Sequence, residues 1–234
     1  MELFRHGAQK KQRGQPLAVR MRPRELSHFV GQRHLLGEGK LLERALARGR
    51  LPSLLLWGPP GTGKTTLAKL LARQAKARFV TLSAVGSGVK DLREVIAKAA
   101  EERDVYGRRT LLFIDEIHRF NKAQQDALLP HVEDGTVVLM GATTENPSFE
   151  VNAALLSRIR VLRLESLTVE DLHQVVDRAL AEDAALKASA VEVDAEHRLV
   201  IAKAAGGDAR RALTTLEVAV SLCAEGETLS QSHV

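Results

Sequence analysis

The sequence predicts an α/β fold, in which helices cover both faces of a parallel five-stranded sheet, followed by a small all-helical domain. Short runs that are apolar on both faces alternate with longer amphipathic segments, as expected for a parallel sheet between helical layers. A glycine-rich turn at 58–66 directly follows the first apolar run. Beyond Leu167 only helical periodicity remains, which indicates a change of domain there.

The elements can be assigned in chain order. The expected strands are the apolar runs at 54–57, 79–83, 110–114, 136–140 and 160–164. The helices expected around them span about 34–49, 64–76, 89–105 and 121–133. Pro130 lacks a backbone N–H, so we expect it to kink the last of these helices.

Thr168 and Asp171 form a capping-box-like start to the helical part, with one helix to about residue 185 and others at about 194–205 and 209–223. We therefore expect three parts. These are a basic flexible tail at 1–18, an α/β nucleotide-binding domain at 19–167 and a helical lid domain at 168–234.

Composition excludes several classes of protein. Hydrophobic residues at 44% and charged residues at 27% are ordinary for a soluble globular chain. A net charge of +5 permits binding to a phosphate backbone, whereas the scarcity of aromatic residues argues against an aromatic platform for bases. Cys223 is the only cysteine, so no disulfide framework is expected. We also expect no membrane span and no signal peptide, and hence a cytoplasmic protein.

The turn after the first strand matches G-x-x-x-x-G-K-[ST], the phosphate-binding P-loop. It consists of Gly58, Pro59, Pro60, Gly61, Thr62, Gly63, Lys64, Thr65 and Thr66. Glycines let successive backbone N–H groups point at phosphates without an obstructing Cβ. Lys64 adds a mobile cation, Thr65 offers a hydroxyl to Mg²⁺, and the next helix directs its positive end at the anion. We therefore expect a bound nucleoside triphosphate.

Two acids end the third expected strand. Asp115 suits a Walker B position, beside the P-loop, where it would hold Mg²⁺ together with Thr65. Glu116 is then placed to polarise the attacking water as a general base. With His118 these acids also spell the D-E-x-H of a helicase box, but the remaining chain is too short and too helical for a second helicase lobe. We expect His118 to report on the nucleotide or to pack locally rather than to shuttle protons.

Other polar residues follow the later strands. Thr144 is our candidate to hydrogen-bond the γ-phosphate or the attacking water, with Asn146 in reserve because turn chemistry engages 146–148. Arg158 precedes the last strand, where a guanidinium can bind a γ-phosphate bidentately, although a surface role is commoner for a single arginine. Arg210, near the start of a late helix, is expected to reach back across the nucleotide cleft.

These motifs together carry a family resemblance. The order of these motifs resembles that in AAA+ ATPases of the clamp-loader and Holliday-junction-motor clade. The motifs are, in order, the P-loop, Asp115-Glu116, the segment 141–144, Ser157-Arg158 and the Arg210 motif. The segments 22–32, 117–126 and 141–149 resemble, more narrowly, the bacterial RarA (MgsA) family, whose eukaryotic relative is the Werner-helicase-interacting ATPase. The resemblance spans about residues 16 to 225.

The resemblance implies roles by position. The hydrolytic set would consist of Lys64, Thr65, Asp115 and Glu116. Thr144 would be sensor 1, Arg210 would be sensor 2, and Arg158 would be the finger that acts on a neighbouring subunit's ATP. The adenine pocket would be lined by Val30, Gly31 and the nearby residues 20–23. It implies ATP and Mg²⁺ as cofactors and a nucleoid-associated location. The implied partners are DNA gaps, ends or forks, further copies of the chain (a tetramer in the family) and replication proteins such as single-strand-binding protein. The family's C-terminal oligomerisation region is expected to be absent from this chain.

The preferred interpretation is a DNA-stimulated, Mg²⁺-dependent ATPase that couples hydrolysis between subunits to DNA remodelling in fork maintenance, recombination and repair. An ATP-gated scaffold or a clamp-loader-like subunit with slow hydrolysis is the alternative. Candidate DNA contacts are Arg108, Arg109, Arg119 and Lys122, for which a solvated basic face remains the competing explanation.

Overall fold

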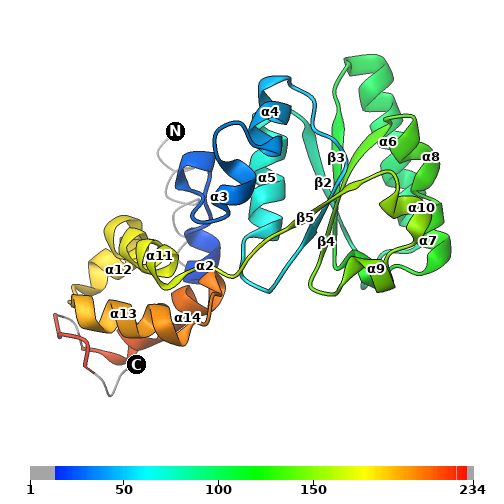
Figure 1. The fold of residues 1–234 in the computed structure, drawn as a ribbon. Helices are drawn as coiled ribbons and strands as arrows, with labels where there is room; N and C mark the ends of the chain where they lie inside the picture. The colour runs from blue at the N-terminus through cyan, green and yellow to red at the C-terminus, as the bar shows by residue number, and fades with distance from the viewer. Residues whose placement is uncertain (1–13, 225, 231–234) are drawn as a thin grey trace. The chain divides into compact units, whose positions relative to one another are not determined.

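The computed structural model describes residues 14–224 and 226–230 and divides into two compact units (Figure 1). Gln32–Glu165 forms an α/β unit, and residues 14–31 join 166–224 and 226–230 in a helical unit. Most of the tail expected at 1–18, and the last residues of the expected lid domain, lie outside the described residues.

The α/β unit is built on a parallel five-stranded sheet, which confirms the predicted fold class. Its strands are β1 (Leu54–Trp57), β2 (Arg78–Ser83), β3 (Thr110–Asp115), β4 (Val137–Thr143) and β5 (Arg160–Arg163), in the order β2-β3-β4-β1-β5. β4 is longer at its carboxyl end than expected and carries Thr143 into register with Trp57 of β1. The carboxyl ends of β1, β3 and β4 therefore meet at one edge of the sheet.

Helices cover both faces of this sheet, because successive strand residues point to opposite sides. Figure 1 shows α4 (Leu41–Ala47) and α5 (Lys64–Gln74) on one face, and α6 (Val89–Tyr106), α8 (Leu129–Glu133) and α10 (Ala153–Leu156) on the other. The second face shares a buried core in which Leu55 and Leu112 of the strands meet Leu92 and Ile96 of α6. The central strands β1, β3 and β4 are thus buried on both sides, as their continuous apolar runs predicted, whereas the edge strands β2 and β5 are partly exposed.

Two expected helices are each divided in the structure. The segment 34–49 forms α3 (Arg33–Leu36) and α4, which are separated by the turn around Gly37. The segment 121–133 forms α7 (Lys122–Asp126) and α8, in which Pro130 occupies the first turn, where its missing N–H costs no helical hydrogen bond. The short elements η2 (Ile117–Arg119) and α9 (Pro147–Glu150) complete the unit.

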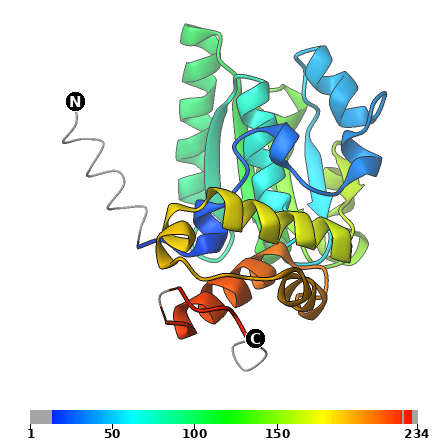
Figure 2. The ribbon, with the colours of Figure 1, turned by 90° about the vertical axis from the view of Figure 1, so that its left-hand side faces the viewer.

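The helical unit contains α2 (Leu17–Arg20), η1 (Leu26–His28), α11 (Val169–Glu182), α12 (Ala184–Ser189), α13 (Ala195–Ala204) and α14 (Ala209–Leu222). Figure 2 shows the blue α2 among the yellow and orange helices of this unit. Leu17, fully buried, belongs to the same core as Leu172 of α11 and Leu216 of α14.

The compact units differ from the expected domain ranges at the amino-terminal side. Residues 19–31 were expected in the α/β domain and 17–18 in a flexible tail, yet both lie in the helical unit. Polar contacts explain the difference. The Arg20 guanidinium pairs with Asp183 (Nε–Oδ2 2.7 Å) and Glu217 (Nη1–Oε1 2.9 Å), which tie α2 to the carboxyl half of the chain.

Candidate nucleotide-binding and hydrolysis site

The P-loop leaves the carboxyl end of β1 and enters α5 at Lys64. The Gly58 N–H donates to the Thr143 carbonyl (3.2 Å), so the loop begins beside the end of β4. Gly63 immediately precedes α5 with φ of 96°, a left-handed conformation that suits glycine and turns the chain into the helix. The Thr62 hydroxyl donates to the Pro59 carbonyl (2.9 Å) and closes the loop on itself.

Lys64 is held inside this loop. Its side chain is buried, and Nζ donates to the carbonyls of Gly58 (2.7 Å) and Pro59 (2.8 Å). A buried ammonium is costly unless it is paired or hydrogen-bonded, and these two carbonyls meet that need while they hold the cation inside the loop. Thr65 and Thr66 follow in the first turn of α5, where backbone N–H groups have no partner within the helix. The loop and the start of α5 thus combine a cation with helix N-terminal N–H groups, as a phosphate-binding site requires.

Asp115 and Glu116 lie at the end of β3, which is separated from β1 only by β4. Both side chains are half-buried. Adjacent strands are about 4.8 Å apart, so the carboxyl end of β3, which carries Asp115, lies about two strand spacings from the carboxyl end of β1, where the P-loop begins. Thr65 and Asp115 supply a hydroxyl and a carboxylate, hard oxygen ligands of the kind that Mg²⁺ prefers.

Glu116 has an unusual backbone and an unusual carboxylate. Its φ of 51° places a non-glycine residue in the left-handed region, a strain that clusters at functional sites. Its Oε2 atom is buried and has no hydrogen-bond partner among the described residues, although His118 Nδ1 lies 3.2 Å away. The side chain as a whole is 35% exposed, so Glu116 also retains contact with solvent, as a general base needs.

The end of β4 differs in detail from expectation. Thr143 is fully buried, and its Oγ1 accepts the Glu145 N–H (3.0 Å) and contacts His118 Nδ1 (2.9 Å). Thr144 is the first residue beyond β4 and is half-buried, so the sensor 1 assignment remains a proposal for this residue. Asn146 caps α9 through its Oδ1 (Ser148 N–H, 3.1 Å), the turn role foreseen for it.

Arg158 lies on the surface, just after α10 and before β5. Its Nε binds Glu133 of α8, and its Nη1 donates to the Ala154 carbonyl (2.7 Å) and the Ser157 hydroxyl (3.0 Å). The guanidinium is thus exposed but held in one place within its own chain. Glu133 was not predicted as a partner of Arg158, because no motif marks an acid that is 25 residues away in the chain.

The remaining predicted residues belong to the helical unit. Gly31 packs against the start of α11 and the segment before it, since a Cβ at this position would lie 2.5 Å from Leu167 Cδ2 and 3.2 Å from Asp171 Oδ2. Val30 packs against the same helical core, and Arg210 is exposed in the first turn of α14. The Arg20 guanidinium, predicted to lie near the adenine pocket, forms ion pairs with Asp183 and Glu217 inside this unit.

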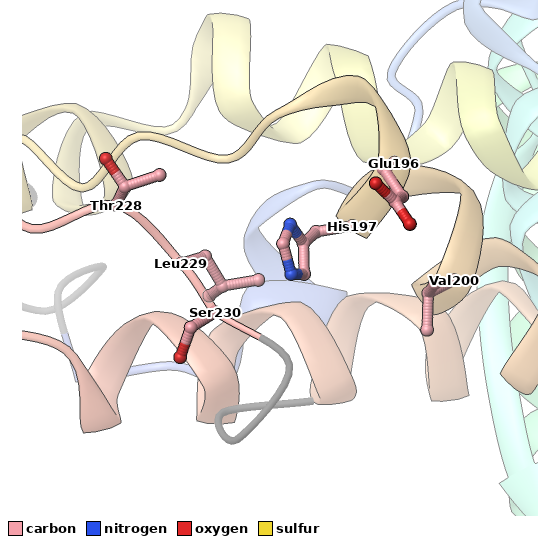
Figure 3. Close-up of a pocket in the computed structure, with 6 residues that line it drawn as sticks. All are labelled: Glu196, His197, Val200, Thr228, Leu229 and Ser230. Atoms are coloured by element: carbon pink, nitrogen blue, oxygen red, sulfur yellow. The ribbon is translucent and has the colours of Figure 1, made fainter.

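The helical unit also contains a surface hollow of about 370 Å³, lined by Glu196, His197, Val200, Thr228, Leu229 and Ser230 (Figure 3). None of these lining residues belongs to the predicted site. Within the described part of the chain, no three His, Cys, Asp or Glu side chains gather as a metal site. No helix in that part is long and apolar enough to cross a membrane.

Comparison with known proteins identifies the family. Residues 54–166 match the model of the ATPase family associated with various cellular activities (AAA). Replication-associated recombination protein A of Escherichia coli K12 is 56% identical over 205 residues, which are 87% of this chain and 46% of the relative. ATPase WRNIP1 of Dictyostelium discoideum is 46% identical over 222 residues, or 95% of this chain and 25% of the relative.

A solved structure, the Thermotoga maritima RuvB Holliday junction branch migration motor, is 30% identical with a TM-score of 0.75. The similarity covers 91% of this chain and 70% of that one. The chain spans a little under half the length of the replication-associated recombination protein A relatives that it matches. On these similarities and on the P-loop geometry, the chain belongs to the AAA family of ATPases and, within it, to the replication-associated recombination protein A family.

Proposed function

We propose that this chain hydrolyses ATP in a Mg²⁺-dependent reaction that DNA stimulates, and that hydrolysis is coupled between subunits to remodel DNA during fork maintenance, recombination and repair. The observation that carries the proposal is the pairing of two features at one edge of the sheet. These are a buried Lys64 ammonium inside the P-loop and a half-buried Glu116 carboxylate at the end of β3. Names of relatives that refer to replication and recombination support the biological setting.

The residues divide the chemistry between them. The P-loop backbone and Lys64 bind and orient the phosphates, while Glu116 accepts the proton of the attacking water. Thr65 and Asp115 would hold Mg²⁺, which supplies neutralising charge for the phosphates when it is bound. Thr144 orients the attacking water or the γ-phosphate from the end of β4.

Replacement of Glu116 by Gln tests this assignment. The amide keeps the shape but cannot accept the proton, so the variant should bind ATP as the wild type does and lose hydrolysis by about 10²–10⁴-fold. Phosphate release and binding of a fluorescent ATP analogue measure the two properties separately. Unchanged turnover would contradict the role of Glu116. A wild type that binds ATP without turnover would instead favour the ATP-gated scaffold or the clamp-loader-like subunit.

Arg158 is proposed to act on the ATP of a neighbouring subunit. Its exposure supports this role, and the bond to Glu133 holds the guanidinium at a defined surface position. A mixture of Arg158→Ala and Glu116→Gln proteins provides the test, because each variant alone lacks one half of the composite site. Mixed assemblies should recover part of the activity, since some interfaces pair an intact Arg158 with an intact Glu116. No recovery from subunits shown to mix would remove the finger role.

The proposed DNA contact uses two of the four basic residues that the sequence offered as candidates. Arg119 and Lys122 are exposed at the carboxyl edge of the sheet, near the end of β3. Arg108 and Arg109 precede the start of the same strand, about 20 Å away for a six-residue strand. Arg109 also donates to the Gly49 carbonyl (3.0 Å), and Arg108 lies 3.7 Å from Glu102. We therefore assign Arg119 and Lys122 to the DNA contact.

Joint replacement of Arg119 and Lys122 by Ala should lower the slope of log affinity against log salt concentration by about 2, one for each phosphate contact. Joint replacement of Arg108 and Arg109 serves as the matched control and should leave the slope unchanged. An unchanged slope in the first variant would remove these residues from the contact. Three further parts of the proposal follow from the family. They are binding to single-strand-binding protein, assembly into an oligomer such as a tetramer, and a cytoplasmic, nucleoid-associated location.

A further inference from the structure

His118 joins the two strand ends that carry the catalytic residues. Its side chain is 15% exposed, and its Nδ1 atom lies 2.9 Å from Thr143 Oγ1 and 3.2 Å from Glu116 Oε2. One ring nitrogen therefore faces the end of β4 and the carboxylate that follows β3. From the sequence this histidine is only the residue three positions after the Walker B aspartate.

The backbone explains how the ring reaches both partners. Glu116 adopts the left-handed conformation and immediately precedes η2, a tight turn that brings His118 back toward Glu116. Phe120, only 2% exposed, anchors the end of this turn in the core. The arrangement stores backbone strain at Glu116, which persists only where surrounding packing enforces it.

Thr143 connects the histidine to the P-loop. Its hydroxyl is within hydrogen-bond distance of His118, and its carbonyl accepts the N–H of Gly58, the first residue of the P-loop. A continuous series of contacts thus runs from the phosphate-binding loop through β4 to the carboxylate of Glu116. Each member of this series is buried or half-buried, so water competes little for the contacts.

We propose that His118 is a positioning residue, which sets the orientation of the Glu116 carboxylate relative to β4 and the P-loop. This inference rests on the proposed ATPase function, because it assigns a partner to the general base of that reaction. A nitrogen that faces both Thr143 and Glu116 restricts the carboxylate to rotamers compatible with the end of β4. Hydrolysis benefits because a misplaced catalytic group can cost about 10²-fold in rate.

Two substitutions separate positioning from simple packing. His118→Leu introduces an apolar side chain of similar bulk and removes both ring nitrogens, whereas His118→Asn places a hydrogen-bonding group near the position of Nδ1. The expected result is a kcat that falls about 10–100-fold in the Leu variant, with KM for ATP unchanged, and that recovers substantially in the Asn variant. His173→Leu, which removes a histidine that pairs with Asp177 on α11 (2.9 Å), is the matched control and should leave kcat unchanged.

Wild-type kcat in the Leu variant would overturn the proposal. So would an Asn variant as slow as the Leu variant, because the ring would then act through its shape. Thermal unfolding of all variants identifies any that fail to fold. In a folded series, Thr143→Val should add little to the defect of His118→Leu, since both remove the same contact.

A second measurement keeps the positioning role separable from the ATPase assignment. The imidazole nitrogen NMR signals of His118 should shift in Thr143→Val and in Glu116→Gln, while those of His173 remain unchanged. This readout needs no hydrolysis. A wild type without turnover would refute the proposed function alone, whereas His118 signals unaffected by both substitutions would refute the contacts on which the positioning role depends.

Discussion

Gly58 is the position at which the structure allows the sharpest test of the P-loop. A Cβ added to this residue would lie 2.3 Å from the carbonyl oxygen of Leu164, closer than real Cβ contacts come. Leu164 cannot move away cheaply, because it is fully buried and its N–H donates to the Trp57 carbonyl (2.7 Å). In Gly58→Ala the start of the P-loop must therefore shift away from the end of β5.

The magnitude follows from that contact. Overpacking a buried site typically costs about 1–3 kcal/mol of unfolding free energy. Strain that is relieved by displacing the loop appears instead in nucleotide affinity, where each 1.4 kcal/mol corresponds to about tenfold in Kd. Gly58→Ala should thus lower stability, nucleotide affinity or both by a total of about 1–3 kcal/mol.

Trp57, the only tryptophan in the chain, immediately precedes Gly58 and reports on both quantities by fluorescence. The Arg163 guanidinium lies 5.5 Å from its ring centroid, so movement between β1 and β5 alters the environment of the ring. Urea unfolding and ATP titration followed at this residue measure the two effects. Gly86→Ala is the matched control, because a Cβ there would meet nothing within 4 Å. Wild-type stability together with wild-type affinity in Gly58→Ala would refute the reasoning.

Two further predictions concern stability. Burial favours a raised pKa for Asp183, but the Arg20 hydrogen bond and the capped N–H groups of α12 outweigh it and lower the pKa. Because the pKa is lowered, the ionised Asp183 stabilises the helical unit at pH values above the ordinary carboxyl pKa, and this stability is lost as pH falls below about 4. Asp183→Asn lacks this titration, so its stability, followed by circular dichroism at decreasing pH, should depend less on pH than that of the wild type. Gln125→Leu should lower the free energy of unfolding in urea by about 1–3 kcal/mol, because the buried Gln125 amide oxygen accepts the Asn152 N–H (2.8 Å). The control Gln74→Leu, at an exposed position, should change the free energy of unfolding little. Equal midpoints for both leucine variants would contradict that account.

Local sequence was sufficient for the elements that depend on short-range patterns. The apolar runs predicted each strand, and the P-loop predicted the turn from β1 into α5, because backbone geometry and burial leave a periodic signature. The helix boundaries were less accurate where short polar turns interrupt a helical pattern, as around Gly37 and between α7 and α8.

The sequence alone therefore determined the fold class and the phosphate-binding loop, since the first follows from the alternation of apolar runs and amphipathic segments along the chain and the second from a short glycine-rich motif. Tertiary structure decided which side chains meet across strands. It placed Thr143 and Glu116 on either side of His118, paired Arg158 with Glu133, and gathered α2 into the helical unit through Arg20. Such contacts join residues far apart in the chain, and they form only when burial of the common cores brings their strands and helices together.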